Sequence, residues 1–246
     1  MTHRFLSFSI PAITMYVGES QYIVGKVKTM KKRNQVRVCV AVVLLLGFVL
    51  WTILLRLVDV QAIGPRGSEV GFATLNGFVH QLTGVHMSLY TITDWLGLVP
   101  IGIVFGFAVL GLVQWIKRKS LLKVDRSILV LGGFYIVVMA AYVLFEIMVI
   151  NYRPVLINGY LEASYPSSTT MLVLCVMPTA ILQLNDRIKT RTLRWCVSLV
   201  ISAFIAFMVV GRLVSGVHWV TDIIGGVLLS TGLIMMYCVF IGLETE

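Results

Sequence analysis

The stretch WCVSLVISAFIAFMVVGRLVSGVHWVTDIIGGVLLSTGLIMMYCVFIG, residues 195–242, decides the fold, because two apolar runs meet in it at a short polar turn. The runs cover residues 195–214 and 219–242, and about 20 helical residues cross the ~30 Å apolar core of a bilayer. Three ionisable residues lie at or near the turn: Arg212, His218 and Asp222. Such groups cost roughly 2.5–3.5 kcal/mol each at membrane depth, so their clustering indicates a function.

The composition as a whole is that of a multi-span membrane protein. The chain has 246 residues, of which 58% are hydrophobic and 13% are charged. A soluble domain of this length is rarely so apolar. We predict an all-α fold, a bundle of six transmembrane helices near residues 38–58, 96–116, 127–150, 168–184, 195–214 and 219–242.

The basic residues predict the orientation of this bundle. Of the 20 Lys and Arg residues, seven precede residue 38, five lie in 117–126 and four lie in 187–194. These segments alternate with the apolar runs and fall on one side, which is the cytoplasmic side by the positive-inside rule. We therefore expect a cell-membrane protein with both termini in the cytoplasm. The same placement argues against nucleic acid as a partner, despite a net charge of +9.

The N-terminal part of the chain differs from the rest. We assign residues 1–37 to a basic cytoplasmic segment and residues 38–246 to a single six-span domain. The stretch from Phe5 to Val17 is apolar but too short to span. It predicts a short helix at the cytoplasmic interface; a signal peptide is the alternative, although no convincing cleavage site follows it.

The segment between the first two predicted spans, residues 59–95, is expected on the outer side. Phe72, Leu75, Phe78, Val79 and Leu82 recur there at near-helical spacing, which predicts an amphipathic helix in the outer interface. The aromatic residues Tyr152, Tyr160, Tyr165 and Trp219 are expected in the interfacial belt. Gly225-Gly226 in the last span is expected to permit close helix packing.

Polar residues at the outer ends of the spans form the candidate site. His218 and Asp222 are four apart, so on a helix the carboxylate would hold one imidazole nitrogen. Arg153 and Arg212 could clamp a tetrahedral oxyanion. Pro166-Ser167-Ser168-Thr169 reads as a capped helix start, and such a terminus binds anions. The set suggests phosphate-ester chemistry with a histidine nucleophile; a purely structural histidine–aspartate pair is the alternative.

The spacing of acidic residues bears on metals and cofactors. No Asp/Glu cluster with the spacing of a magnesium site accompanies the basic residues. This favours a metal-independent covalent route, and no cofactor is implied.

Three motifs resemble the signature of the type 2 phosphatidic acid phosphatase superfamily, whose integral-membrane branch has six spans and an outer-face site. The pattern of that family is Lys-x6-Arg-Pro, then Pro-Ser-Gly-His, then Ser-Arg-x5-His-x3-Asp. The corresponding residues here are Glu146-x6-Arg153-Pro154, Pro166-Ser167-Ser168-Thr169 and Gly211-Arg212-x5-His218-x3-Asp222.

The resemblance implies a role for each matching residue. Arg153 and Arg212 would bind the phosphoryl oxygens, and Ser167 with the backbone of Ser168 would donate hydrogen bonds to them. His218 would attack phosphorus to form a phosphohistidine, with Asp222 fixing its tautomer. Water would then release phosphate.

Three positions depart from the pattern: Glu146 replaces the lysine, Thr169 replaces the histidine that protonates the leaving group, and Gly211 replaces a serine. A threonine hydroxyl is a poor acid, and general acid catalysis is typically worth about 10²–10⁴ in rate. Glu146 could supply the proton if burial raises its pKa, or it could pair with either arginine. His80 or His86 could act if the outer segment folds over the site.

We therefore expect a membrane lipid phosphatase, active on a lipid phosphate or a polyprenyl diphosphate at the outer face of the bilayer. The alternative is a catalytically impaired relative that binds a lipid phosphate or assists a partner. A small-solute transporter is disfavoured because no repeat is visible.

Overall fold

The computed structural model describes the backbone of residues 10–242 and the side chains of residues 32–242. The described chain is mostly helical and contains no strand, only three isolated bridges in its loops. Eight α-helices form it: α1 (Ile10–Leu54), α2 (Ala73–Thr83), α3 (Met87–Leu96), α4 (Leu98–Arg118), α5 (Arg126–Ile147), α6 (Ser168–Arg187), α7 (Arg191–Val214) and α8 (Val220–Gly242).

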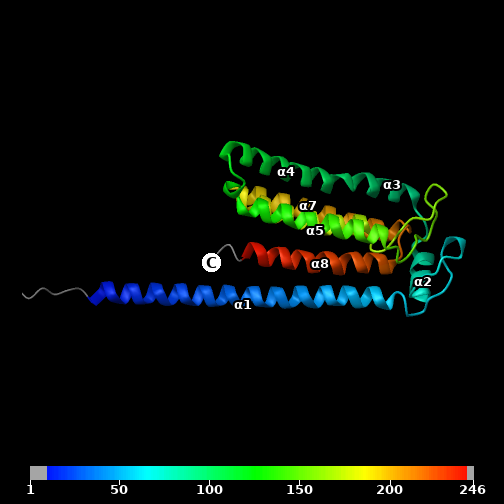
Figure 1. Ribbon diagram of the computed structural model, residues 1–246, viewed down its shortest axis with the longest axis horizontal. Coiled ribbons are helices and arrows are strands. Elements are labelled where there is room, and N and C mark those ends of the chain that lie inside the picture. The colour runs from blue at the N-terminus through cyan, green and yellow to red at the C-terminus, as the bar shows by residue number, and fades with distance from the viewer. Residues whose placement is uncertain (1–9, 243–246) are drawn as a thin grey trace, which may run out of the picture.

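Six stretches are long and apolar enough to cross a membrane: Lys32–Leu54 of α1, Met87–Arg118 of α3 and α4, and the whole of α5, α6, α7 and α8. They run roughly along one axis, and α2 lies across their end (Figure 1). The predicted all-α, six-span architecture is confirmed.

The N-terminal helix differs from its prediction. Residues 10–17 begin the 45-residue helix α1 rather than forming a separate helix, so that prediction is wrong there; residues 5–9 lie outside the described part. Pro11 does not interrupt α1, because a proline in the first turn removes an N–H group that has no helical partner anyway. The helix runs without a break past residue 37, and the domain boundary placed there stays a prediction.

Helices α1, α5 and α6 pack against the last helix, α8. Figure 1 shows α1 and α8 side by side. The core between them contains Phe48, Leu131, Tyr165 and Tyr237, each no more than 6% exposed. The Tyr165 ring stacks on Phe48 with centroids 6.0 Å apart. α8 is therefore the centre of the bundle, and it is held on several sides.

Two glycines let α8 approach its neighbours. A Cβ atom on Gly225 would collide with the ring of Tyr165, and one on Gly226 would lie 3.3 Å from the Ser167 carbonyl oxygen. This close approach agrees with the packing role predicted for Gly225-Gly226.

We expect Gly225→Ala to destabilise the protein by about 1–3 kcal/mol, the usual cost of overpacking a core. Tyr165 comes directly after Ser164 in the chain. A displaced Tyr165 ring should therefore shift Ser164 and lower activity as well. Thermal unfolding in detergent is the measurement. Gly102→Ala in α4 is the matched control, because a Cβ atom there meets nothing within 4 Å; equal melting temperatures for the two variants would contradict the packing argument.

The second span begins earlier than predicted, at Met87 instead of residue 96. Gly97, between α3 and α4, keeps helical angles (φ −60°, ψ −17°), so the two helices continue into each other. Thr91, Thr93 and Asp94 interrupt the apolar pattern of α3, which hid the start of the span. As a consequence, α3 lies against α7.

The predicted amphipathic helix is present as α2. Its apolar residues Leu75, Phe78 and Leu82 are exposed, whereas Asn76 is fully buried. The Asn76 amide donates to the Gly71 carbonyl (2.8 Å) and to the Thr221 hydroxyl (3.0 Å). α2 is thereby attached to the first turn of α8.

Two of the four residues predicted for the aromatic belt belong to the interior. Tyr165 is 1% exposed and its hydroxyl is 2.7 Å from the Thr52 hydroxyl. Trp219 is 3% exposed and its indole donates to the Tyr152 carbonyl at 2.8 Å. Both therefore support the loops at the end of the bundle where α2 lies, and their assignment to the belt is wrong.

Candidate active site

The predicted residues Arg153, Arg212, His218 and Asp222 come together at the end of the bundle where α2 lies. Arg153 lies in the loop between α5 and α6, Arg212 in the last turn of α7, His218 in the following turn and Asp222 in the first turn of α8. All four are buried, with exposed fractions of 9%, 1%, 3% and 0%.

The turn between α7 and α8 is shaped by Ser215 and Gly216. The Ser215 hydroxyl donates to the Arg212 carbonyl (2.8 Å), and the Ser215 carbonyl accepts the N–H of His86 (2.9 Å). Gly216 has φ +68°, and a Cβ atom on it would collide with the backbone of Gly84. Glycine is therefore needed here both for its angle and for the close passage of the chain.

The Asp222 carboxylate caps the start of α8 and accepts several hydrogen bonds. Its Oδ2 accepts the N–H of Trp219 at 2.9 Å, an arrangement like that of a capping box. The amide of Asn151 donates to Oδ1 at 3.3 Å, and the hydroxyl of Ser164 donates to Oδ2 at 2.5 Å. These partners hold the carboxylate in one orientation.

The predicted direct hydrogen bond between His218 and Asp222 is not formed. His218 Nδ1 lies 3.9 Å from Asp222 Oδ2, beyond hydrogen-bond distance. The Ser164 hydroxyl lies between them, 3.1 Å from Nδ1. Asp222 therefore acts on the imidazole through Ser164.

The other imidazole nitrogen faces two cations. Nε2 of His218 lies 3.5 Å from Arg153 Nη1 and 3.3 Å from Arg212 Nη2. A guanidinium only donates, so we assign the proton of His218 to Nδ1 and a free lone pair to Nε2. Burial, and then the charges of Arg153 and Arg212, hold the pKa of His218 well below its usual value. The imidazole is thus a neutral base or nucleophile near neutral pH.

Arg212 is held mainly by α3. Its Nη1 lies 3.4 Å from the Thr93 hydroxyl and 3.6 Å from a carboxylate oxygen of Asp94. Its guanidinium also lies over the ring of Tyr90, 5.0 Å from the centroid. These contacts are long for a buried cation, and Nε has no hydrogen-bond partner among the described residues. Arg212 therefore keeps donor capacity for an anion.

Arg153 is held in a similar way. Its Nε lies 3.2 Å from a carboxylate oxygen of Glu162, and its guanidinium lies 5.8 Å from the centroid of Tyr90. The ring of Tyr90 thus contacts both guanidiniums. The two arginines pair with Glu162 and Asp94, so the suggested pairing of Glu146 with either of them is not what the described residues show.

Ser167 has a structural role at the start of α6. It is the N-cap residue, with its hydroxyl accepting the N–H of Thr170 at 3.5 Å. Its own N–H donates to the Asp222 carbonyl at 3.1 Å. The predicted capped helix start is therefore present, and it is attached directly to the first turn of α8.

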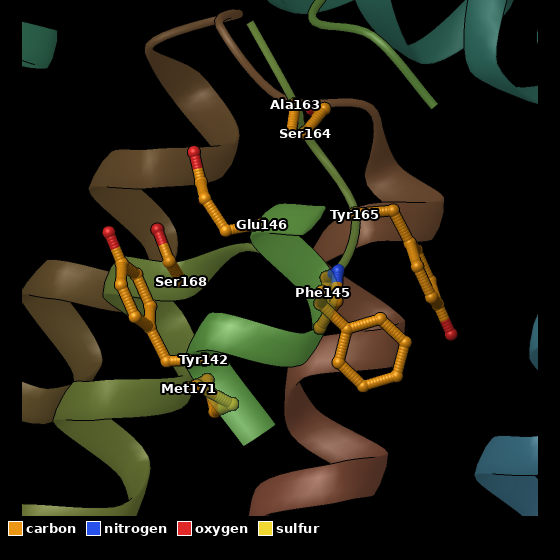
Figure 2. Close-up of a pocket in the computed structure, with 9 residues that line it drawn as sticks. Tyr142, Phe145, Glu146, Ala163, Ser164, Tyr165, Ser168 and Met171 are labelled. Atoms are coloured by element: carbon orange, nitrogen blue, oxygen red, sulfur yellow. The ribbon is translucent and has the colours of Figure 1, made fainter. Parts of the chain in front are cut away.

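Ser168 and Thr169 are half-buried and face cavities on either side of this helix start. Ser168 lines a small pocket with Glu146 and Ser164. In Figure 2 the polar ends of Glu146, Ser168 and Tyr142 lie on one side of that pocket, opposite the Tyr165 ring. Glu146 is exposed, so the burial that its suggested acid role requires is absent.

Thr169 and Ser168 also line a larger cavity of about 410 Å³ between α4, α5 and α6. Asp94 is a polar residue of the cavity lining. Most of the other lining residues are apolar: Leu98, Ile101, Val104, Val138, Met139, Leu172 and Val176. The cavity therefore joins the polar end of the bundle to its apolar interior.

The two other histidines suggested as acids have different neighbours. The ring of His80 packs on Trp219 with centroids 5.5 Å apart. His86 is exposed, and its Nε2 lies 2.9 Å from the Thr83 carbonyl oxygen. His80 thus makes a packing contact, whereas His86 makes a hydrogen bond to the backbone.

Several site residues were missed from the sequence: Tyr90, Thr93, Asp94, Asn151, Glu162 and Ser164. Asn151 lies inside the first motif and Ser164 lies two residues before the second, so a search for polar residues in and beside the motifs would have found both. Nothing in the local sequence of α3 indicates its contact with α7.

One protein family matches the part of the chain that contains these residues. Residues 136–244 match the family model described as the PAP2 superfamily. A comparison with curated protein sequences finds no match. A similar solved structure is the first transmembrane PAP2-type phosphatidylglycerolphosphate phosphatase from Bacillus subtilis, with 20% identity, a TM-score of 0.48 and coverage of 83% of this chain and 96% of that one. Residues 136–244, which contain all four of these buried residues, are thus similar to the PAP2 superfamily.

Proposed function

We propose that the protein is a membrane-embedded phosphohydrolase that removes phosphate from a lipid phosphate or a polyprenyl diphosphate through a phosphohistidine. One observation carries the proposal: two guanidiniums converge on His218 Nε2, at 3.5 and 3.3 Å, while Ser164 and Asp222 hold the opposite nitrogen. A phosphoryl group bound by both arginines lies next to a free imidazole lone pair. Positioning and charge stabilisation of this kind are the main contributions to phosphoryl transfer.

The reaction proceeds in two steps. Nε2 of His218 attacks phosphorus, the bond to the leaving oxygen breaks, and Arg153 and Arg212 stabilise the charge on the phosphoryl oxygens. The positive charge that develops on the imidazole is balanced by Asp222 through the Ser164 hydroxyl. Water then attacks phosphorus, phosphate leaves and His218 is restored. Ser168, at the start of α6, donates a further backbone hydrogen bond to the phosphate.

The position of the site favours a lipid substrate in the outer leaflet. The cavity of about 410 Å³ leads from Asp94, Ser168 and Thr169 into an apolar lining between spans. A lipid phosphate can place its headgroup at the arginines while its tail stays among the helices. With six spans, both termini lie on one side, and the basic segments assign that side to the cytoplasm and the site to the outer face.

A lipid-phosphate-binding protein without turnover is the second candidate. It is favoured by one observation, the threonine at position 169 where the family has its general acid. The arginines, the helix start and the cavity would serve binding equally well.

Phosphate release from a panel of substrates separates the two candidates. We expect the purified protein, in detergent micelles with a metal chelator, to release phosphate from at least one of phosphatidate, phosphatidylglycerol phosphate and a polyprenyl diphosphate. Arg153→Gln should lower kcat/KM by about 10²–10³, the usual effect of removing one donor to a developing oxyanion. The matched control is Arg66→Gln, because Arg66 is exposed and, among the described residues, donates to the Gly159 carbonyl.

A wild-type protein that binds these lipids but releases no phosphate from any of them would refute the enzyme and support the binding protein. Equal activities of Arg153→Gln and Arg66→Gln would instead place the reaction away from the arginines.

A further inference from the structure

Helix α3 forms a wall of the candidate site that lies outside the region matched by the family model. The match covers residues 136–244, whereas α3 is Met87–Leu96. Tyr90 contacts both guanidiniums, and Thr93 and Asp94 lie 3.4 and 3.6 Å from Nη1 of Arg212. None of these residues has a role in the steps described above.

Asp94 lies across the guanidinium of Arg212 from the nucleophile. Nη2 of Arg212 lies 3.3 Å from His218 Nε2, and Nη1 of the same group lies 3.6 Å from Asp94 Oδ1. A phosphoryl group bound along this guanidinium has His218 at one end and Asp94 at the other. In phosphoryl transfer the attacking and leaving atoms are roughly in line through phosphorus, so the leaving oxygen points to the side of Asp94.

Asp94 also lies next to the position of the missing acid. A Cβ atom on Gly97, three residues further along, would be 3.7 Å from the Thr169 methyl group. Asp94 and Thr169 line the same cavity of about 410 Å³. The side chain of Asp94 is 58% exposed, so its carboxyl group has room to turn from Arg212 toward a bound substrate.

We propose that Asp94 is the proton donor to the leaving group, taking the role that Thr169 cannot fill. The inference rests on the proposed function. The anionic substrate takes the place of Asp94 on Arg212, which leaves the Asp94 carboxyl group to face the leaving oxygen. The charged group in contact with Asp94 is Arg212 of α7, whose guanidinium in turn contacts His218 and Tyr90.

Asp94 gives up a proton in the first step and regains one in the second. As His218 bonds to phosphorus and the phosphorus–oxygen bond breaks, the carboxylic acid of Asp94 gives its proton to the leaving oxygen, which departs as an alcohol. The Asp94 carboxylate then takes a proton from the water that attacks the phosphohistidine. The phosphorus–nitrogen bond breaks, phosphate leaves, and Asp94 is again protonated.

A comparison of leaving groups tests this role. The substrates are a long-chain alkyl phosphate, whose alkoxide leaves poorly, and p-nitrophenyl phosphate, whose phenolate leaves without protonation. We expect Asp94→Asn to lower kcat on the alkyl phosphate by about 10²–10⁴ and on p-nitrophenyl phosphate by less than about tenfold. Retained nitrophenyl phosphatase activity also shows that the variant is folded.

The matched control is Glu162→Gln, which removes the acidic partner of the other arginine. It should change both substrates by the same factor, since its effect passes through Arg153. Adding Thr169→His to Asp94→Asn should restore alkyl phosphate hydrolysis at least about tenfold, because an acid returns to the same cavity.

Two results would overturn the proposal for Asp94 while leaving the phosphatase intact. One is an equal loss on both substrates, which would make Asp94 only a partner of Arg212. The other is a gain in rate in Asp94→Asn, which would make it a competitor of the substrate. A wild-type protein inactive on both substrates refutes the proposed function itself.

Discussion

Replacing His218 by alanine should lower phosphate release by roughly 10⁴- to 10⁶-fold, the scale of losing a catalytic nucleophile. The only imidazole nitrogen that both guanidiniums face among the described residues is Nε2 of His218. Without it, the bound phosphoryl group has no neighbouring nucleophile, although Arg153 and Arg212 remain. Substrate affinity should therefore change much less than kcat.

The covalent intermediate gives a second measurement of the same prediction. Rapid quenching into base with ³²P-labelled substrate should trap label on the wild-type protein and none on His218→Ala. His86→Ala is the matched control, because that ring is exposed and contacts the Thr83 carbonyl. Labelled His218→Ala, or an unlabelled wild type during rapid turnover, would rule out the phosphohistidine.

The pH dependence of kcat/KM follows from the same residue. The neutral imidazole is the active form, and burial with the charges of Arg153 and Arg212 lowers the pKa of His218 well below 6.5. Acidification through pH 6.5 should therefore leave His218 neutral and active. The value of kcat/KM should fall only at lower pH. Because kcat/KM reports the free enzyme, a histidine limb at or above pH 6.5 would contradict the buried, doubly flanked imidazole.

Asp222→Asn should lower kcat by about 10³- to 10⁴-fold, the effect expected when a buried carboxylate no longer stabilises the right histidine tautomer. The asparagine carbonyl can still accept the N–H of Trp219, so the start of α8 is preserved. What is lost is the negative charge that balances the imidazolium through Ser164. Melting temperature in detergent should stay close to that of the wild type.

Ser164→Ala tests the relay separately. We expect a loss of about 10- to 100-fold, smaller than for Asp222→Asn, because the charge remains but its hydrogen-bonded link to Nδ1 is gone. Ser167→Ala is a useful comparison, since that hydroxyl bonds the helix start rather than the imidazole. Full activity of Ser164→Ala would show that Asp222, at 3.9 Å from Nδ1, closes the gap by itself.

The positions of the spans could be predicted from sequence because crossing a bilayer depends on local composition. An apolar run of sufficient length must satisfy its backbone hydrogen bonds within itself, and a helix does so. The ends of α5, α6, α7 and α8 accordingly fall within about four residues of their predicted ends. The second span began earlier than predicted, because Asp94 and its neighbours made the start of α3 look like a loop.

The main residues of the candidate site could also be predicted, because the spacing of residues in a short segment indicates which side chains lie close together. Arg212, His218 and Asp222 lie within eleven consecutive positions, and the cap at Ser167 lies at a recognisable helix start. Burial was harder to predict: Tyr165 and Trp219 read as interfacial aromatics, but each has partners from other segments.

By itself, then, the sequence determined a six-span helical bundle and the main residues of the candidate site. Only the tertiary structure decided what completes them. Ser164 reaches His218 across 54 positions of the chain, and Thr93 reaches Arg212 across 119. Such contacts depend on which helices pack together, and no local pattern records that. The physical reason is that side-chain partners are chosen by the packing of α3 and the α5–α6 loop against α7 and α8, whereas spans and caps are chosen within each segment.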